Sequence, residues 1–319
     1  MNFTTKIPIQ KYHHPITYES KIMLLGSCFA TNIGNKFEYF KFQTTINPFG
    51  IVFNPVSLAK IIVRSVQKEY YTENDIFFHN DLWHCFEVHS ELSHPDKNTF
   101  LNSLNELIDT THQQIKAASH LFITLGTSWV YRNIATNEIV ANCHKVAQKE
   151  FEKELLTIKT IEQQIETILS ALSVVNLNCK LIFTVSPVRH IKDGFAENTL
   201  SKAHLITAIQ RKIIHHPTRL NYFPAYEIMM DELRDYRFYA EDMLHPNPTA
   251  IDYIWIQFYE NYILKSEFEW MNQIYDIQRG LQHKPFNPNT ASHQKFLSDL
   301  KIKMTTIKKK LPFISFENE

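Results

Sequence analysis

Three short apolar runs, each followed by a helical pattern, constrain the fold of this chain more than any other feature. The runs lie at residues 22–25, 120–125 and 180–185, and each reads as one buried strand. A glycine or a serine follows each run, and apolar residues at helical spacing come later. Strands that alternate with helices of this kind predict βαβ units and therefore an α/β fold with a mainly parallel sheet.

The remaining elements follow from the same periodicities and from turn residues. Helices are predicted over 28–40, 55–68, 96–118, 148–173 and 198–215, with a further one that begins at Asn247-Pro248. Short strands are predicted near 42–46 and 220–224, and hairpins over 75–90 and 129–142. We expect a main domain over residues 1–263 and a helical extension, Lys-rich at its end, over 264–319 that packs on it.

The charge balance argues against one class of function. The 319 residues include 33 Lys+Arg and 33 Asp+Glu, so the formal net charge is +0. We therefore expect no nucleic-acid partner, because nucleic-acid binders present a basic surface to phosphates. The sequence shows no apolar stretch of the kind that signal peptides or membrane spans need, and its four cysteines are scattered without a C-x-x-C pair. These features predict a cytoplasmic protein with no membrane span.

A serine lies at the junction between the first predicted strand and its helix, in the run Gly26-Ser27-Cys28-Phe29-Ala30. The free N–H groups at a helix N-terminus favour negative charge, and open α/β sheets place reactive groups at the carboxyl ends of strands. Ser27 is therefore a candidate nucleophile. The same position also suits a serine that only caps the helix, and the residues alone leave both interpretations open.

A candidate general base lies near the far end of the chain, in Asp242-Met243-Leu244-His245-Pro246-Asn247. Asp-x-x-His spacing in a loop brings a carboxylate to one ring nitrogen of its own histidine, so that the other nitrogen can face a serine. The alternative is a loop aspartate that caps local N–H groups beside an exposed histidine. The position just before a Pro-initiated helix favours the first interpretation.

Other residues at strand ends are candidates for a shared pocket. Three of the six glycines lie at or just after candidate strand ends: Gly26, Gly50 and Gly126. Glycine there lets a ligand approach the backbone closely, although ordinary tight turns explain it too. Arg189 and His190 follow another strand end. Arg189 suits a carboxylate or phosphate of a substrate, while a surface or helix-capping arginine fits equally well.

A metal site is the less favoured reading of a histidine-rich segment that contains His84, Cys85, His89 and His94. Neighbouring residues on a strand, such as His84 and Cys85, point to opposite faces, which argues against joint ligation. No tight zinc-ligand spacing occurs, so we expect neither a metal nor another cofactor. The aromatic residues of this segment favour core packing, with a hairpin lid as the alternative.

The order of an early nucleophile and a late acid–base pair resembles the SGNH or GDSL hydrolases. Within them, the run Gly26-Ser27-Cys28-Phe29-Ala30 resembles the motif that gives the GSCFA-domain family its name. The similarity covers roughly residues 20–260. Further segments that resemble the family pattern are Asn47–Ile51, Thr124–Trp129, Asn142–Lys145, Ser186–His190 and Asp242–Pro246.

This resemblance implies a three-layer α/β/α fold of the flavodoxin-like type. It also implies a catalytic triad in which Ser27 is the nucleophile, His245 is the base and Asp242 orients the base. The roles of Ser27, His245 and Asp242 are inferred from the first and last of the matching segments, which are the most specific ones.

The resemblance further implies an oxyanion hole with the N–H groups of Ser27 and Gly50 and an asparagine side chain as donors. The chain departs from that pattern because Ser128 stands where asparagine would be. A hydroxyl donates only one proton, from a shorter arm, so Asn142 or Asn47 are alternative donors. The residues expected to contact the substrate are Asn47, Gly126, Thr127, His144, Arg189 and His190.

Taken with the resemblance, the residues predict an esterase-type serine hydrolase. The expected substrate is an O-acetyl or other short acyl ester of a carbohydrate or a small metabolite, by analogy with the superfamily. Two other functions stay open. One is a non-catalytic domain of the same fold that binds a small molecule or a glycan. The other is a structural partner protein that uses the Lys-rich C-terminal helices.

Overall fold

A computed structural model of the protein describes residues 5–316. Within these residues, five strands form the central sheet: β1 (Lys21–Gly26), β2 (Gln43–Ile46), β5 (His120–Leu125), β9 (Lys180–Val185) and β10 (Leu220–Tyr222). They lie in the order β10-β9-β5-β1-β2, and every neighbouring pair is parallel. Counted along the chain, this is the order 2-1-3-4-5 that is known from flavodoxin. The predicted mainly parallel α/β sheet is confirmed.

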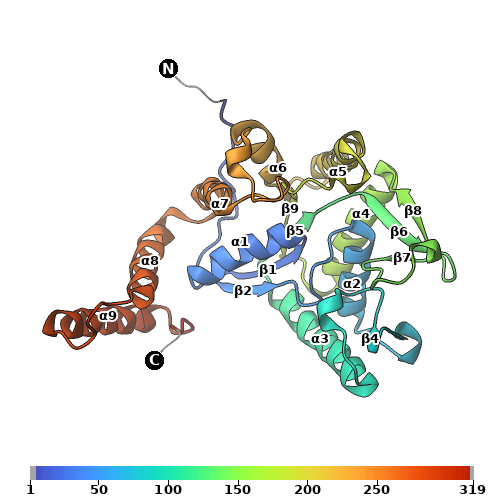
Figure 1. Ribbon diagram of the computed structural model, residues 1–319. Coiled ribbons are helices and arrows are strands. Elements are labelled where there is room, and N and C mark those ends of the chain that lie inside the picture. Colours follow the sequence, from blue (N-terminus) through green and yellow to red (C-terminus); the bar gives the residue numbers. More distant parts are fainter. Residues whose placement is uncertain (1–4, 317–319) are drawn as a thin grey trace.

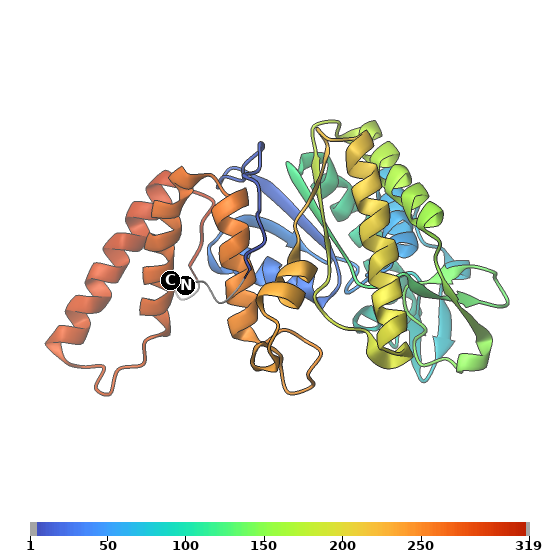
Figure 2. The same cartoon turned by 90° about the horizontal axis from the view of Figure 1, so that it is seen from above.

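Helices cover both faces of this sheet and complete three layers (Figures 1 and 2). One face carries α2 (Pro55–Gln67), α3 (Lys97–Ala117), α4 (Ile158–Val175) and α5 (Phe195–His215), and the other carries α1 (Cys28–Tyr39) and α7 (Pro248–Tyr262). Strand β1 shows how the layers arise. Its Met23 and Leu25 belong to the first core, whereas Ile22 and Leu24 belong to the second. An apolar run without alternation therefore serves both faces, because successive side chains of a strand point to opposite sides.

Two antiparallel insertions extend the loops between the parallel strands. Strands β3 (Phe77–His79) and β4 (Leu82–His84) form a short hairpin, which the sequence predicts. Strands β6 (Trp129–Asn133), β7 (Ile139–Val140) and β8 (Phe151–Leu155) form a second sheet in the order β7-β6-β8.

The prediction of one helix over 148–173 is wrong at its start. Residues 151–155 form β8, and helix α4 begins only at Ile158. Strand β8 pairs antiparallel with β6, with Trp129 opposite Leu155 and Asn133 opposite Phe151. This long-range pairing, which the local apolar spacing does not reveal, overrides the helical pattern.

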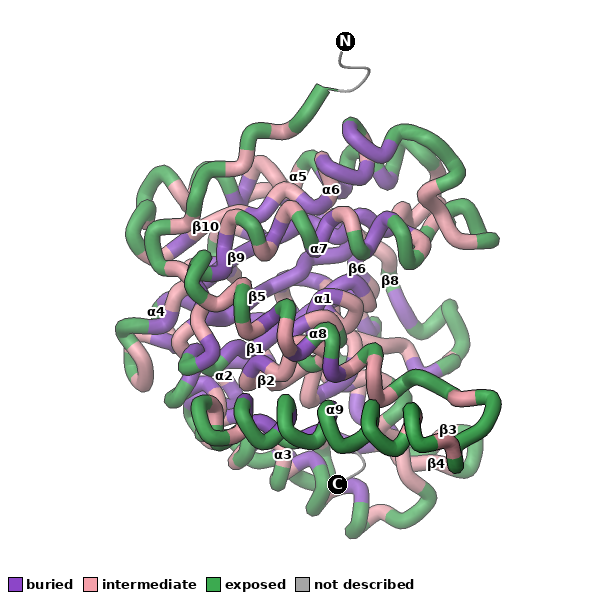
Figure 3. The backbone as a smooth tube through the Cα atoms, turned by 90° about the vertical axis from the view of Figure 1, so that its left-hand side faces the viewer, coloured by how far each residue is buried: buried purple, intermediate pink, exposed green. Residues whose placement is uncertain are grey.

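The C-terminal helices extend from the α1–α7 face, where α8 (Phe268–Gln282) and α9 (Ala291–Lys310) form a hairpin (Figure 1). Ile274 on α8 and Ile307 on α9 join the same buried core as α1 and α7. Gln278 Nε2 donates to the carbonyl of Tyr39 at 3.0 Å, which ties α8 to the end of α1. Much of α9 is exposed (Figure 3). No helix within residues 5–316 has the length and apolar character needed to cross a membrane.

Candidate functional site

Ser27 lies at the carboxyl end of β1 and caps helix α1. The preceding Gly26 has a φ of +135°, and a Cβ atom there would lie 2.2 Å from the carbonyl oxygen of Thr124 on β5. Only glycine therefore fits this close approach of the two strands. The Ser27 N–H donates to that same Thr124 oxygen at 3.1 Å, and Ser27 Oγ accepts from the N–H of Phe29 at 3.3 Å. The residue is only 2% exposed.

The candidate base and its aspartate lie in the loop before α7 and contact each other directly. Asp242 Oδ2 accepts from His245 Nδ1 at 2.5 Å, while Oδ1 accepts from the N–H groups of Leu244 and His245 at 2.9 and 3.0 Å. The hydrogen bonds from the His245 and Leu244 N–H groups and from the imidazole lower the pKa of Asp242 to about 2. The aspartate therefore stays ionised and favours the tautomer with the proton on Nδ1, which leaves Nε2 to accept a proton.

The serine turn and the Asp242–His245 loop lie at the same edge of the sheet. Burial raises the pKa of the Cys28 thiol above its usual value, and the Asp242 carboxylate adds to that rise. Asp242 is thus within electrostatic reach of the residue next to Ser27. Of the described residues, Phe29 is the one that hydrogen-bonds the Ser27 hydroxyl. The contact between Ser27 and His245 therefore stays a prediction.

Arg189, in the loop after β9, is engaged with the loop that carries His245. Its guanidinium lies 4.4 Å from the ring centre of Tyr239 and donates to the carbonyl of Met243. Its backbone N–H donates to the carbonyl of Leu244 at 3.4 Å. These contacts give Arg189 a structural task that does not involve a substrate anion.

His190 is a neutral imidazole beside His245. Its ring stacks on Phe53 with 5.5 Å between the ring centres, and its backbone N–H donates to Asn198 Oδ1 at 2.8 Å. Burial, together with the charges of Lys202 and His245, lowers its pKa to about 3. Its Nε2 is buried and has no hydrogen-bond partner among the described residues. The imidazole also lines a cavity of about 240 Å³, together with Phe53, Asn54, Thr127, Trp129 and Lys153 among others.

Most of the predicted oxyanion donors are already hydrogen-bonded within the fold. The Gly50 N–H donates to the carbonyl of Asn47 at 2.8 Å. The Ser128 hydroxyl is fully buried and donates to the carbonyl of Ser201 at 3.0 Å. Since the Ser27 N–H is also engaged, these three groups are not aimed at an open cavity. Asn142 accepts from the His144 N–H at 2.8 Å through Oδ1, and nothing among the described residues bonds its amide nitrogen.

Asn47 and His144 both have hydrogen-bond partners within the fold. Asn47 Oδ1 accepts from the Gly26 N–H at 2.8 Å, which fixes the turn in front of Ser27. His144 is buried under the β3–β4 hairpin, where Nε2 lies 2.7 Å from the carbonyl of Cys85. Burial lowers the pKa of His144 to about 4.

Gly126 and Thr127 follow β5 and are fixed by neighbouring elements. The Gly126 N–H donates to the carbonyl of Phe53 at 2.9 Å, and Thr127 Oγ1 lies 2.8 Å from Ser201 Oγ on α5. Thr127 also lines the 240 Å³ cavity beside His190. The structure thus places Thr127 and His190 at one cavity, and their contact with a substrate stays a prediction.

Lys202 is a residue of this edge that the sequence reasoning missed. It is 1% exposed, and its ammonium donates to the carbonyls of Gly126 and Ser186 at 2.6 and 2.8 Å. Burial lowers its pKa to about 7. A signal was available, because position 202 lies on the same helix face as Leu205 and Ile209 and is therefore an inward-facing position.

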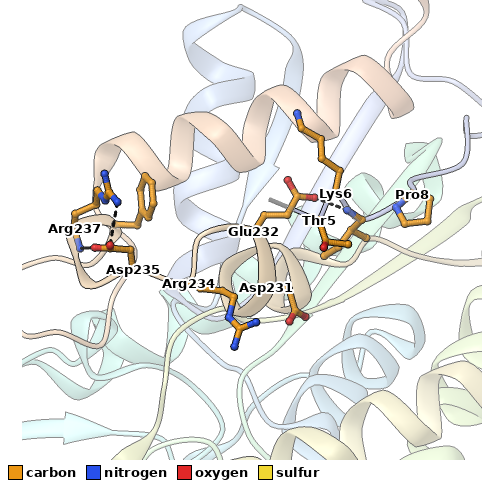
Figure 4. Close-up of a pocket in the computed structure, with 10 residues that line it drawn as sticks. Thr5, Lys6, Pro8, Asp231, Glu232, Arg234, Asp235 and Arg237 are labelled. Atoms are coloured by element: carbon orange, nitrogen blue, oxygen red, sulfur yellow. Dashed lines mark hydrogen bonds and ion pairs between the residues drawn. The ribbon is translucent and has the colours of Figure 1, made fainter. Parts of the chain in front are cut away.

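Other parts of the described structure do not add to this site. Within residues 5–316, no group of three or more His, Cys, Asp and Glu side chains is placed to hold a metal ion. A cavity of about 810 Å³ lies between Thr5–Pro8 and residues 231–238 (Figure 4). Glu232, at its wall, accepts from the N–H of Ile7 at 2.7 Å. None of the predicted site residues lines this cavity.

Comparison with known protein families identifies the chain. Residues 274–319 match the family described as GSCFA domain protein, C-terminal domain. No curated protein matches the sequence. Residues 21–258 match the GSCFA family, and this stretch contains the turn around Ser27, the loops after β5 and β9, and the Asp242–His245 pair. The chain therefore belongs to the GSCFA family.

Proposed function

We propose that this protein is a serine hydrolase of the esterase type. Ser27 attacks the acyl carbonyl of an ester, His245 accepts the serine proton, and Asp242 holds the imidazole. The observation that carries the proposal is the 2.5 Å contact between His245 Nδ1 and Asp242 Oδ2, on a loop within electrostatic reach of the Ser27 turn. An imidazole oriented by a carboxylate is one part of what nucleophilic acyl transfer requires, and the proposal adds its contact with the Ser27 hydroxyl.

The chemical steps follow from this arrangement. When Ser27 Oγ bonds to the carbonyl carbon, its proton moves to His245 Nε2 and the carbonyl oxygen becomes an oxyanion. The imidazolium then gives that proton to the leaving alcohol, and an acyl-enzyme remains. Water, deprotonated by the same imidazole, releases the acid and restores Ser27. The substrate class we propose is an O-acetyl or other short acyl ester of a carbohydrate or a small metabolite. The superfamily to which this proposal refers is that of the SGNH or GDSL hydrolases.

The hydrogen bonds made by the predicted oxyanion donors require a rearrangement in this mechanism. The Ser27 N–H must release the Thr124 carbonyl, or another donor must take its place. Catalytic hydrogen bonds are often poorly aligned before substrate binds, so the hydrogen bonds of the substrate-free protein are compatible with the mechanism.

Covalent labelling with a fluorophosphonate tests the proposal. We expect the native protein to be labelled at Ser27, and Ser27→Ala and His245→Ala to remain unlabelled while folded. Thr157→Ala is a matched control, because Thr157 caps α4 as Ser27 caps α1, accepting from Thr160 N–H at 3.1 Å. Both capping variants lose about 1 kcal/mol of stability, but only Ser27→Ala loses labelling. A folded native protein that reacts with no such probe contradicts the hydrolase.

A non-catalytic binding domain is the second candidate, and one observation favours it. The Ser27 hydroxyl serves as a helix cap, and the Gly50 N–H and Ser128 hydroxyl are satisfied inside the fold. A domain that only binds would keep these bonds. It would remain unlabelled and would bind a small molecule or glycan without turnover, which calorimetry and product analysis distinguish from hydrolysis.

A further inference from the structure

A cavity of about 240 Å³ lies on one face of the second sheet, β7-β6-β8. Tyr131 on β6 is paired with Val140 on β7 and with Lys153 on β8, so these three side chains point to the same face. Trp129 precedes Tyr131 by two residues on β6 and therefore points the same way. All four residues line the cavity. The sheet that is inserted after β5 thus supplies one wall of this cavity.

A short helical turn in the loop after β9, η4 (Ile191–Asp193), also contributes to the cavity. The Asp193 carboxylate accepts from the Lys153 ammonium, and this ion pair ties η4 to β8. The same ammonium lies 5.4 Å from the ring centre of Trp129 and 5.5 Å from that of Tyr131. These contacts fix the wall before any ligand binds, and a preformed wall lowers the free-energy cost of binding.

The cavity lies near the turn that carries Ser27. The Ser27 N–H donates to the carbonyl of Thr124 at 3.1 Å, and Thr127, three residues further along, lines the cavity. Three residues of backbone span at most about 10 Å. His190, which lines the cavity too, is within electrostatic reach of His245, whose charge contributes to its low pKa after burial and the charge of a lysine. A small substrate is therefore long enough to reach from the cavity to Ser27.

The size and the walls of the cavity restrict the group that it holds. Drug-sized ligands occupy pockets of about 300–1,000 Å³, so a cavity of about 240 Å³ takes one compact part of a larger molecule. Its lining includes the rings of Phe53, Trp129 and Tyr131. Aromatic walls favour a flat group with apolar faces, because such a group makes the largest contact with them.

The charges at the cavity favour an anion. Among the described residues that line it, Lys153 and Lys192 are cationic and Asp193 is the one carboxylate, while burial keeps His190 neutral. Burial and the charge of Lys192 both lower the pKa of Lys153, so the two cations lie within electrostatic reach of each other. Since Asp193 pairs with Lys153, the exposed Lys192 has no carboxylate partner in the part of the chain that the structure describes. A negatively charged ligand would supply that partner.

We propose that this cavity binds a compact ring of the ester substrate that carries a carboxylate or a similar negative charge, with the ring against Trp129 and Tyr131 and the charge at Lys192. The inference rests on the proposed hydrolase, because it assigns the cavity to one group of that enzyme's substrate. It narrows the substrate class from short acyl esters in general to those whose alcohol part is a ring with an acidic group.

Benzoate and its neutral counterpart benzamide test the binding step at pH 7 and low salt. The chain has four tryptophans, so their indole N–H signals in proton–nitrogen NMR report where a ligand binds, and Trp129→Phe identifies the signal of Trp129. We expect both ligands to shift this signal. Benzoate should bind about fivefold more tightly than benzamide, which is the scale of one partly exposed ion pair. Shifts confined to the other tryptophans, or equal affinities, overturn the proposal.

Lys192→Gln removes the unpaired cation and leaves the ion pair between Lys153 and Asp193 in place. We expect this variant to bind benzoate and benzamide equally. Lys159→Gln is the matched control, because Lys159 is an exposed lysine on α4 that does not line the cavity, and it should keep the fivefold preference. Tyr131→Ala removes part of the aromatic wall and should weaken both ligands by about fivefold. A Lys192→Gln variant that keeps the preference for benzoate overturns the proposal, as does native affinity in Tyr131→Ala.

Two acetate esters connect the cavity with the reaction. Phenyl acetate and 3-acetoxybenzoate share the acetyl group and the ring, and they differ by one carboxylate. The ratio of kcat/KM for 3-acetoxybenzoate to kcat/KM for phenyl acetate should be about fivefold higher in the native protein than in Lys192→Gln. If a fluorophosphonate does not label Ser27 but benzoate binds as expected, the hydrolase fails and the anion site stands. If Ser27 is labelled and the ratio is the same in both proteins, the assignment of the cavity to the substrate fails and the hydrolase stands.

Discussion

A single carboxylate, Asp242, both folds its loop and orients the imidazole. Oδ1 accepts two backbone N–H groups, while Oδ2 faces His245 Nδ1. The loop thus holds its conformation through the same residue that fixes the tautomer of His245. Because each oxygen has its own partner, a substitution that keeps one oxygen and replaces the other separates loop folding from imidazole orientation.

Asp242→Asn should leave the fold intact and abolish most of the activity. The amide oxygen can still accept the backbone N–H groups, but the amide nitrogen cannot accept from His245 Nδ1, so the wrong tautomer is favoured. In a triad this change lowers kcat by about 10⁴. Fluorophosphonate labelling and ester hydrolysis measure the effect. Asp235→Asn is the control, because Asp235 caps a nearby turn by accepting from the Arg237 N–H at 2.9 Å. Equal losses of activity in both variants would show that Asp242 only stabilises the loop.

Lys202 should make the stability of the protein depend on pH in a defined direction. Its folded pKa is about 7, and the unfolded side chain keeps the ordinary value of 10.5. Between these values the unfolded state binds more protons, so the free energy of unfolding rises with pH. Relative to Lys202→Met, we expect the native protein to gain stability on the order of 4 kcal/mol from pH 7 to pH 10.5. Urea unfolding at several pH values measures this difference, and a constant difference across the window contradicts the low pKa.

The sequence reveals residues whose partners are close along the chain. Asp242 and His245 are three positions apart, and the predicted contact between them is present. Lys202 reaches carbonyls at positions 126 and 186, and only the assembled sheet brings them to its amine. A lysine in a helix is normally solvent-exposed, so its burial follows from tertiary packing and not from local pattern.

Among the elements, α5 is the one that joins the loops after β5 and β9. Ser201 is 1% exposed, and its hydroxyl oxygen lies within hydrogen-bond distance of Thr127 Oγ1, the Ser128 N–H and Ser128 Oγ. Since these groups are buried, each would lose a partner if the hydroxyl were removed. The helix therefore acts on the site through its polar inner face.

Ser201→Ala should destabilise the fold by about 1–3 kcal/mol, because the Ser128 N–H is left without a partner. Thr199→Ala on the same helix should change stability by less than about 0.5 kcal/mol, since Thr199 is exposed and its hydroxyl bonds the carbonyl of Phe195, one turn earlier, at 3.0 Å. Urea unfolding of both variants provides the comparison. Indistinguishable stabilities would show that Ser201 does not hold the loop.

The elements that the sequence predicts best are those whose pattern is continuous. Strands β1, β5 and β9 lie where the three apolar runs occur, because burial on both faces requires such runs. Strand β8 was missed because its sequence mixes charged and apolar residues, and its burial is only partial. Residues 151–155 form a strand because they pair with β6, which lies more than fifteen residues earlier in the chain.

At the scale of the whole molecule, the C-terminal hairpin covers an aromatic surface of the α/β domain. Tyr259 on α7 contacts Phe268 with 5.3 Å between the ring centres, and Tyr39 contacts Tyr275 on α8 at 6.2 Å. Trp255 lies in the same core, stacked on Phe40. The hairpin thus completes a core that the domain leaves open on this side.

Deletion of residues 264–319 should therefore lower the melting temperature and expose apolar surface. We expect the shortened chain to bind a hydrophobic dye and to aggregate, because Trp255 and Tyr259 lose their cover. Differential scanning calorimetry and light scattering measure both effects. A shortened chain that stays monomeric with an unchanged melting temperature would instead indicate that the Lys-rich helices bind another protein.

The pairing of Ile16 with the end of α7 has a consequence for synthesis on the ribosome. The Ile16 N–H donates to the carbonyl of Tyr262 at 2.8 Å, and the Leu264 N–H donates back to the carbonyl of Ile16 at 2.9 Å. The segment around Ile16 leaves the ribosomal exit tunnel on the order of tens of seconds before its partner segment around Leu264. Until then the apolar side chains around Ile16 are exposed to chaperones, and this pairing forms only after residue 264 has left the ribosome.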